Sequence, residues 1–118
     1  LVRAAGPDPE PALAAAIGRI AAHIATLRRM SISVAGMLEG GKSPEVEAAL
    51  VKGLGNDFEK LLPEIARLAA DDSIAAAARF GRFRESLRDT LLLSPSFTIR
   101  GGTREILRGV IARGLGLR

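Results

Sequence analysis

The sequence predicts an all-α protein, an antiparallel up-and-down bundle of three to four helices. Apolar residues recur at intervals of three and four over most of the chain, and no segment shows the period-two alternation typical of a strand. Glycine and proline pairs separate the helical stretches. With 118 residues, the chain has the length of one domain and can bury one compact core. We expect residues 1–8 to form an N-terminal linker and residues 9–118 to form a single helical-bundle domain.

The first predicted helix begins after Asp8 and Pro9, which supply an N-cap and a first-turn proline, and it ends at Gly40 and Gly41. Its apolar positions follow the spacing of an amphipathic helix: Leu13, Ile17, Ile20, Ile24, Leu27, Val34 and Leu38. His23 flanks this stripe. Because no partner residue has the spacing of a catalytic site, we expect His23 to be a packed or surface residue.

The second predicted helix begins at Ser43 and Pro44 and carries glutamates in its first turn, where negative charge is favourable. Its apolar residues repeat the three-four spacing: Val51, Leu54, Phe58, Leu61, Ile65 and Leu68. Because the connection from the first helix is short, the two helices should pack antiparallel. Gly53 and Gly55 permit the close approach of a neighbour, and Pro63 is expected to kink the helix near its end.

The C-terminal part contains two further helical stretches. After a polar break we expect a third helix over much of residues 74–93, and a last helix from about Arg104 to Arg113. Between them, Ser94 and Pro95 are expected either to interrupt the third helix or to begin a short new turn.

Gly101 and Gly102 precede the last helix and are followed by Thr103, a residue typical of helix N-caps. Two successive glycines favour positive φ angles or the close approach of another group, so we expect residues 101–103 to be non-helical. The helix should restart near Arg104. A helix N-terminus in such a bend exposes unpaired N–H groups and a partial positive charge, which suit phosphates, carboxylates and polarised carbonyls.

The composition excludes several classes of site. The chain has no cysteine, which excludes disulfides, thiolate metal sites and a cysteine nucleophile, and its single histidine excludes a histidine-based metal cluster. No apolar run approaches the roughly 20 residues needed to cross a bilayer, and the N-terminus lacks the pattern of a signal peptide, so we expect a cytoplasmic protein. The chain begins with Leu1 rather than methionine, which leaves open whether it is a fragment or a complete product.

Positive charge is concentrated in the C-terminal part. The formal net charge is +4, and residues 73–118 carry nine arginines against three acidic residues. A one-sided basic face is the electrostatic signature of nucleic-acid binding, but the sequence has no recognised binding motif and neither tyrosine nor tryptophan for stacking. We therefore expect no nucleic-acid partner.

The C-terminal segment IRGGTREILRGVIARGLGLR resembles the closing motif of the acyl-CoA dehydrogenase family, an aromatic-x-Gly-Thr-x-x-Ile stretch followed by a final helix. The long first helix and its GGKSPEVEAALVK junction resemble two successive helices of that family's C-terminal bundle. Together these segments cover most of residues 10–118. The resemblance implies a C-terminal domain or fragment of an FAD-dependent oxidoreductase of lipid metabolism, which dehydrogenates acyl-CoA thioesters between the α and β carbons.

The resemblance also implies roles for individual residues. Gly102 would lie near the substrate thioester, while Thr103, Arg104 and Glu105 would approach the FAD cofactor. Gly101 stands where many relatives carry the catalytic glutamate, and a glycine cannot act as a base, so the catalytic residue of this chain is unknown. The domains that hold much of the flavin and substrate in the family lie outside this chain. We therefore expect the isolated chain to be inactive and to bind FAD and acyl-CoA weakly or not at all.

A second class of function stays open, that of a non-catalytic helical assembly module or a degenerate partner subunit of a mixed complex. Both long helices have wider apolar faces than one antiparallel partner needs, with further apolar residues at Met30, Ile32, Met37, Leu50 and Leu62. We expect the chain to form homo-oligomers or hetero-oligomers through its helices, with a two-fold dimer favoured.

Overall fold

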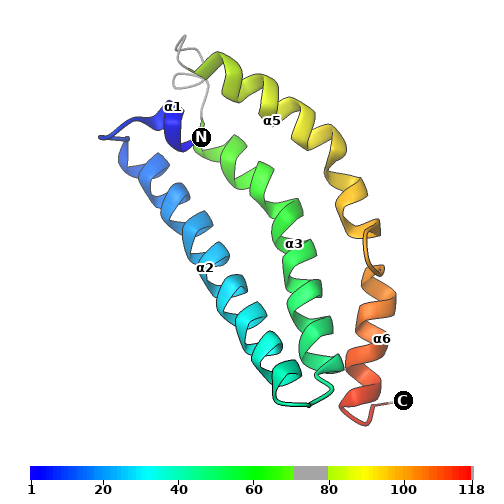
Figure 1. Ribbon diagram of the computed structural model, residues 1–118. Coiled ribbons are helices and arrows are strands. Elements are labelled where there is room, and N and C mark those ends of the chain that lie inside the picture. The colour runs from blue at the N-terminus through cyan, green and yellow to red at the C-terminus, as the bar shows by residue number, and fades with distance from the viewer. Residues whose placement is uncertain (71–79, 118) are drawn as a thin grey trace.

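The computed structural model describes residues 1–70 and 80–117, in which every regular element is a helix (Figure 1). The elements are α1 (Val2–Ala5), α2 (Pro11–Glu39), α3 (Glu45–Ala69), α5 (Gly81–Leu93), the 3-10 helix η2 (Ser94–Ile99) and α6 (Arg104–Gly114). The predicted all-α bundle is confirmed.

The helices form a flat layer with α3 in its middle. One neighbour of α3 is α2, which runs antiparallel to it, and on the other side α5, η2 and α6 follow one another as a single long arm (Figure 1). The molecule measures 52 × 26 × 20 Å along its principal axes, as expected for an elongated layer of helices. Because α3 packs against neighbours along its two flanks, both broad faces of the layer leave part of its surface open.

The connection between α2 and α3 is tight for a local reason. Gly41 adopts a φ of 73°, and Lys42 N–H donates to the Met37 carbonyl at 2.9 Å, which closes the end of α2 in the manner of a Schellman motif. The start of α2 differs from the prediction, since Glu10 is the N-cap and Pro11 is the first-turn proline. Asp8 therefore does not cap this helix.

The main apolar core lies where α1, the start of α2, the end of α3 and the start of α5 meet. Phe80 and Leu13 are fully buried there, together with Ala5 and Ala69. The ring of Phe83 meets that of Phe80 edge-on, with centroids 5.9 Å apart. Residues 1–8 thus differ from the expected linker, because they contain α1, and Ala5 of this helical turn belongs to the core.

The predicted apolar stripe of α3 is covered only in part. Ile65 is buried, but Leu54 and Leu61 are exposed and Leu68 is 71% exposed. The buried positions of α3 include smaller residues instead, among them Ala49 and Ala66. The stripe of large residues therefore lies mainly on an open face of the layer, because close packing to two neighbours selects the small side chains of α3.

The remaining elements follow the expected order. Of the third helix predicted for residues 74–93, α5 begins at Gly81, and residues 74–79 lie outside the described residues. A new turn does begin at Ser94, where η2 replaces the α-helix. Helix α3 continues through Pro63 to Ala69. None of the helices in the described parts of the chain is long and apolar enough to span a membrane.

Candidate functional site

The bend before α6 has the backbone that its glycines predict. The φ angles of Gly101 and Gly102 are 75° and 109°, which side-chain-bearing residues rarely adopt, and residues 101–103 are non-helical. The helix restarts at Arg104. Gly102 lies against Leu107, whose side chain would be 3.5 Å from a Cβ atom placed at that glycine. The predicted bend and restart are both confirmed.

Thr103 is the N-cap of α6, although its side chain does not cap the helix. Its backbone is extended, its carbonyl accepts the first helical hydrogen bond from Leu107 N–H at 3.0 Å, and no side-chain cap is formed among the described residues. The backbone N–H of Glu105 and then the Thr103 hydroxyl instead bind the Glu105 carboxylate, and they hold its pKa below the ordinary 4.5. The start of α6 thus stabilises a negative charge, the Glu105 carboxylate.

Two arginines at the bend form ion pairs with acidic residues of α3. Arg104 donates a hydrogen bond to the Asp57 carboxylate. This hydrogen bond, together with the negative charge of Asp57, raises the pKa of Arg104. Arg100 reaches Glu59 at 3.5 Å, and its guanidinium lies 5.1 Å from the ring centroid of Phe97. All of these ion pairs are exposed, so water and salt screen them and their role is chiefly to orient the bend.

Gly101 is exposed and lies beside the side chain of Lys52. A Cβ atom at Gly101 would lie 3.3 Å from Lys52 Cε and 3.8 Å from Lys52 Nζ. Residues 101–103 themselves include no acidic side chain. Of the residues assigned by resemblance, Gly102, Thr103, Arg104 and Glu105 lie together at the start of α6, as their adjacency in sequence requires.

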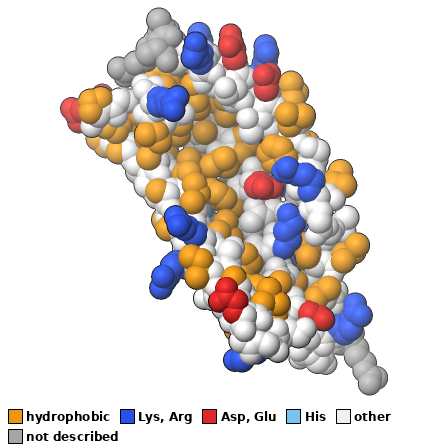
Figure 2. Space-filling view, viewed as in Figure 1, with side chains coloured by type: hydrophobic (Ala, Val, Ile, Leu, Met, Phe, Trp, Pro, Cys, Tyr) orange, Lys and Arg blue, Asp and Glu red, His pale blue; other side chains and the backbone are white. Residues whose placement is uncertain are grey.

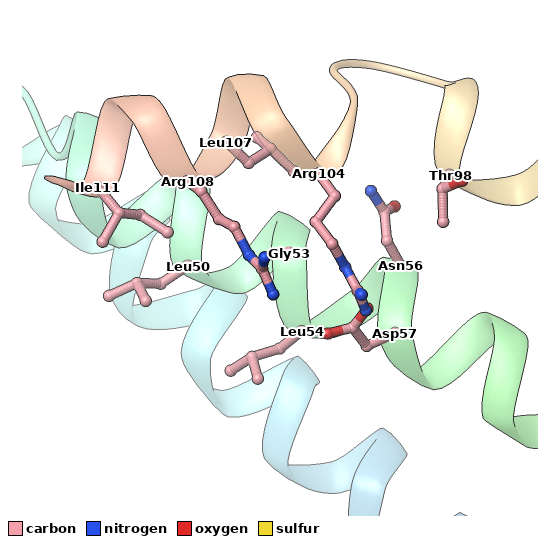
Figure 3. A pocket seen from close by; sticks show the side chains of 10 residues that line it. All are labelled: Leu50, Gly53, Leu54, Asn56, Asp57, Thr98, Arg104, Leu107, Arg108 and Ile111. Atoms are coloured by element: carbon pink, nitrogen blue, oxygen red, sulfur yellow. The ribbon is translucent and has the colours of Figure 1, made fainter.

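A small pocket lies between α3 and α6 on the side where Arg104 and Arg108 project toward α3 (Figure 3). Its volume is about 150 Å³. Leu50, Leu54 and Ile111 give it apolar walls. The amide of Asn56 points from α3 toward the space between Arg104 and Thr98. Sequence reasoning did not single out Asn56 or Asp57, although their positions on α3 one turn beyond Gly53 place them beside a helix that approaches closely.

A larger apolar groove lies on another face of the layer, between α2 and α5 and above α3, where hydrophobic side chains gather in a hollow (Figure 2). It has a volume of about 580 Å³ and includes Ile20, Ile24, Leu62 and Leu87. At about 100° per residue, Leu62 and Leu50 lie roughly 120° apart around α3, which separates this groove from the small pocket.

Neither His23 nor the acidic residues of the described chain form a metal-binding cluster. His23 is exposed and its ring stacks on that of Phe58, with centroids 5.0 Å apart, in agreement with a packed or surface role. Within residues 1–70 and 80–117, no three histidine, cysteine or acidic side chains cluster in a way that could hold a metal ion.

Comparison with known proteins gives no significant match to a family model, to a curated protein or to a solved structure.

Proposed function

We propose that this chain is the C-terminal helical domain of a cytoplasmic FAD-dependent oxidoreductase similar to the acyl-CoA dehydrogenases. In this proposal it supplies helix packing, subunit contacts and one edge of the site where flavin and acyl-CoA thioester meet. The parent enzyme removes a proton from the α carbon and transfers a hydride from the β carbon to flavin N5. The resemblance of the C-terminal segment is the origin of this proposal.

The observation that carries the proposal is the geometry of the Gly101–Gly102 bend. Two successive positive φ angles expose the backbone, and they lead directly into the N-terminus of an α-helix. Since neither glycine has a Cβ atom, a substrate carbonyl or a polar flavin edge could approach this backbone from the sides that Lys52 and Leu107 leave open. The partial positive charge of the helix end favours such polarised oxygen atoms.

The domain contributes positioning rather than proton abstraction. Gly101 offers no base and residues 101–103 contain no carboxylate, so the α proton must leave to a carboxylate from another part of the parent protein. Glu105 is anionic and bound by Thr103 and its own backbone N–H, which suits a residue that accepts hydrogen bonds from a ligand. This division of roles explains why the isolated chain should be inactive.

The proposal is tested by mapping FAD binding on the isotope-labelled chain with amide NMR spectra. We expect weak binding in fast exchange, with chemical-shift changes concentrated at residues 101–106 and a smaller response to riboflavin, which lacks the phosphates. Gly102→Ala should reduce these shifts, whereas the matched variant Gly109→Ala, in open space within α6, should retain them. Micromolar affinity, or shifts confined to the groove between α2 and α5, would contradict the proposed role.

A second candidate function is that of a non-catalytic assembly module, which the open groove between α2, α3 and α5 favours. Several large apolar residues on the faces of the layer are exposed, among them Ile24 at 52%. Burying a few hundred Å² of such surface at about 25 cal/mol per Å² gives several kcal/mol toward association before entropic costs. A second copy related by a two-fold axis would cover the groove of both partners.

Sedimentation equilibrium tests association through the groove independently of the proposed flavin site. We expect the wild-type chain to form dimers at tens of micromolar protein, and Ile24→Glu to shift the equilibrium toward monomer because it places a charge in the groove. Ile32→Glu is the matched control, since Ile32 is 54% exposed on the same helix and does not line the groove. A monomeric wild-type chain, or equal effects of both variants, would refute association through the groove.

A further inference from the structure

The small pocket between α3 and α6 has features that the proposed flavin role does not use. It lies beside the bend and shares only Arg104 with the residues assigned to flavin. Its distinctive members are Asn56 from α3 and Arg108 from the second turn of α6. Each of these two side chains offers hydrogen-bonding capacity that no described residue satisfies.

Asn56 is the clearest sign that this pocket can accommodate a polar group. The residue is 3% exposed, and neither its Nδ2 nor its Oδ1 atom has a hydrogen-bond partner among the described residues. Figure 3 shows its amide directed into the space between Arg104 and Thr98. Buried polar side chains are nearly always paired, because an unpaired amide loses its hydration without compensation. A polar group that enters this space would restore the lost hydrogen bonds.

The charges of the pocket indicate the sign of that group. Arg104 is neutralised by Asp57, whereas Arg108 forms no ion pair within the described part of the chain. Two arginines and one aspartate leave the pocket lining with one net positive charge. Glu105 is near enough for Arg108 to lower its pKa slightly, but Glu105 does not line the pocket. A monoanion balances this lining, whereas a doubly charged phosphate does not.

The apolar residues that line the pocket indicate the chemistry of the rest of the ligand. Leu50 and Leu54 from α3 and Ile111 from α6 lie to one side of the tip of Arg108, so an apolar tail attached to the anion could pack against them (Figure 3). The volume of about 150 Å³ limits the ligand to a few heavy atoms.

We propose that this pocket binds a short-chain monocarboxylate. The Arg108 guanidinium donates to both carboxylate oxygens in the forked geometry that suits this pair, and Asn56 Nδ2–H donates to one of them. Oδ1 of Asn56 accepts an arginine N–H that turns toward it as the ligand binds. The alkyl chain lies against Leu50, Leu54 and Ile111. This site does not depend on the proposed flavin function, because neither Asn56 nor Arg108 is assigned to flavin.

The test is a titration of the labelled 118-residue chain with sodium butyrate, followed through the side-chain NMR signals of Asn56 and Arg108. We expect saturable shifts with millimolar affinity, and weaker binding of neutral butanamide and of inorganic phosphate. Asn56→Leu should weaken butyrate binding roughly tenfold through the loss of one charge-assisted hydrogen bond, and Arg108→Gln should weaken it at least as much because it removes the forked pair. Arg113→Gln, an exposed arginine of α6 outside the pocket, should bind butyrate like the wild-type chain.

Three results would overturn the proposal. They are the absence of saturable shifts at Asn56, equal losses in Arg108→Gln and Arg113→Gln, and phosphate binding at least as tight as butyrate binding. Because Asn56 is buried, circular dichroism spectra must show that Asn56→Leu is folded. Arg108 is exposed, so Arg108→Gln decides the question even where the leucine variant does not fold.

Discussion

Replacing Gly102 by alanine should destabilise the chain, and the backbone of the bend gives the magnitude. Gly102 has a φ of 109°, and an L-residue forced to positive φ costs about 1–2 kcal/mol. Steric overlap adds little, since the nearest atom to a new Cβ would be Leu107 Cδ2 at 3.5 Å, an ordinary contact distance. The free energy of unfolding should therefore fall by about 1–2 kcal/mol for a purely conformational reason.

Gly109, in the helix that follows the bend, provides the matched control. It lies within α6 and a Cβ there meets nothing within 4 Å, so Gly109→Ala should raise the free energy of unfolding by about 0.5–1 kcal/mol through helix propensity. Urea unfolding followed by circular dichroism measures both values. If Gly102→Ala were as stable as Gly109→Ala, the bend would not require positive φ, and the reasoning about an exposed glycine backbone would fail.

Three further predictions concern charge and the base position. Because the pKa of Glu105 is lowered in the folded chain, its contribution to stability is present above its ordinary pKa of 4.5 and is lost as the pH falls through the folded value. Glu105→Gln should therefore show a smaller loss of stability than wild type between neutral and strongly acidic pH in urea unfolding, and an identical acid profile would contradict the assigned contacts. Thr103→Val should reproduce part of this change, since it removes the hydroxyl that helps to lower the pKa. Gly101→Glu should not produce dehydrogenase turnover with FAD, an acyl-CoA and an electron acceptor, because the new carboxylate would meet Lys52 and stay ion-paired; measurable turnover would refute this.

The course of the backbone was predictable because local signals specify it. Gly40 and Gly41 ended the first helix as expected, and the Gly-Gly-Thr sequence produced the bend and the restart at Arg104. These features depend on which φ angles a residue tolerates, and such preferences can be read from the residue itself.

The arrangement of side chains was less predictable because it depends on neighbours distant in sequence. The apolar stripe of α3 suggested a buried face, yet Leu68 is exposed, since α3 meets both neighbours through its flanks. Asn56 lies in a polar stretch that reads as a surface turn of helix, yet it is buried in the folded chain. The ion pair of Asp57 with Arg104 joins residues 47 positions apart, and no periodic pattern identifies such a pair.

The most direct test of the proposed function is a search for nuclear Overhauser effects between FAD and the chain in their weak complex. The account predicts contacts between protons of the flavin ring and the methyl group of Thr103, because the start of α6 is assigned to one edge of the flavin. The adenine protons should show no such contact with Thr103. Contacts of the flavin ring only with Ile24 or Leu87 of the apolar groove, or no contact at Thr103 at ligand saturation, would contradict the central claim.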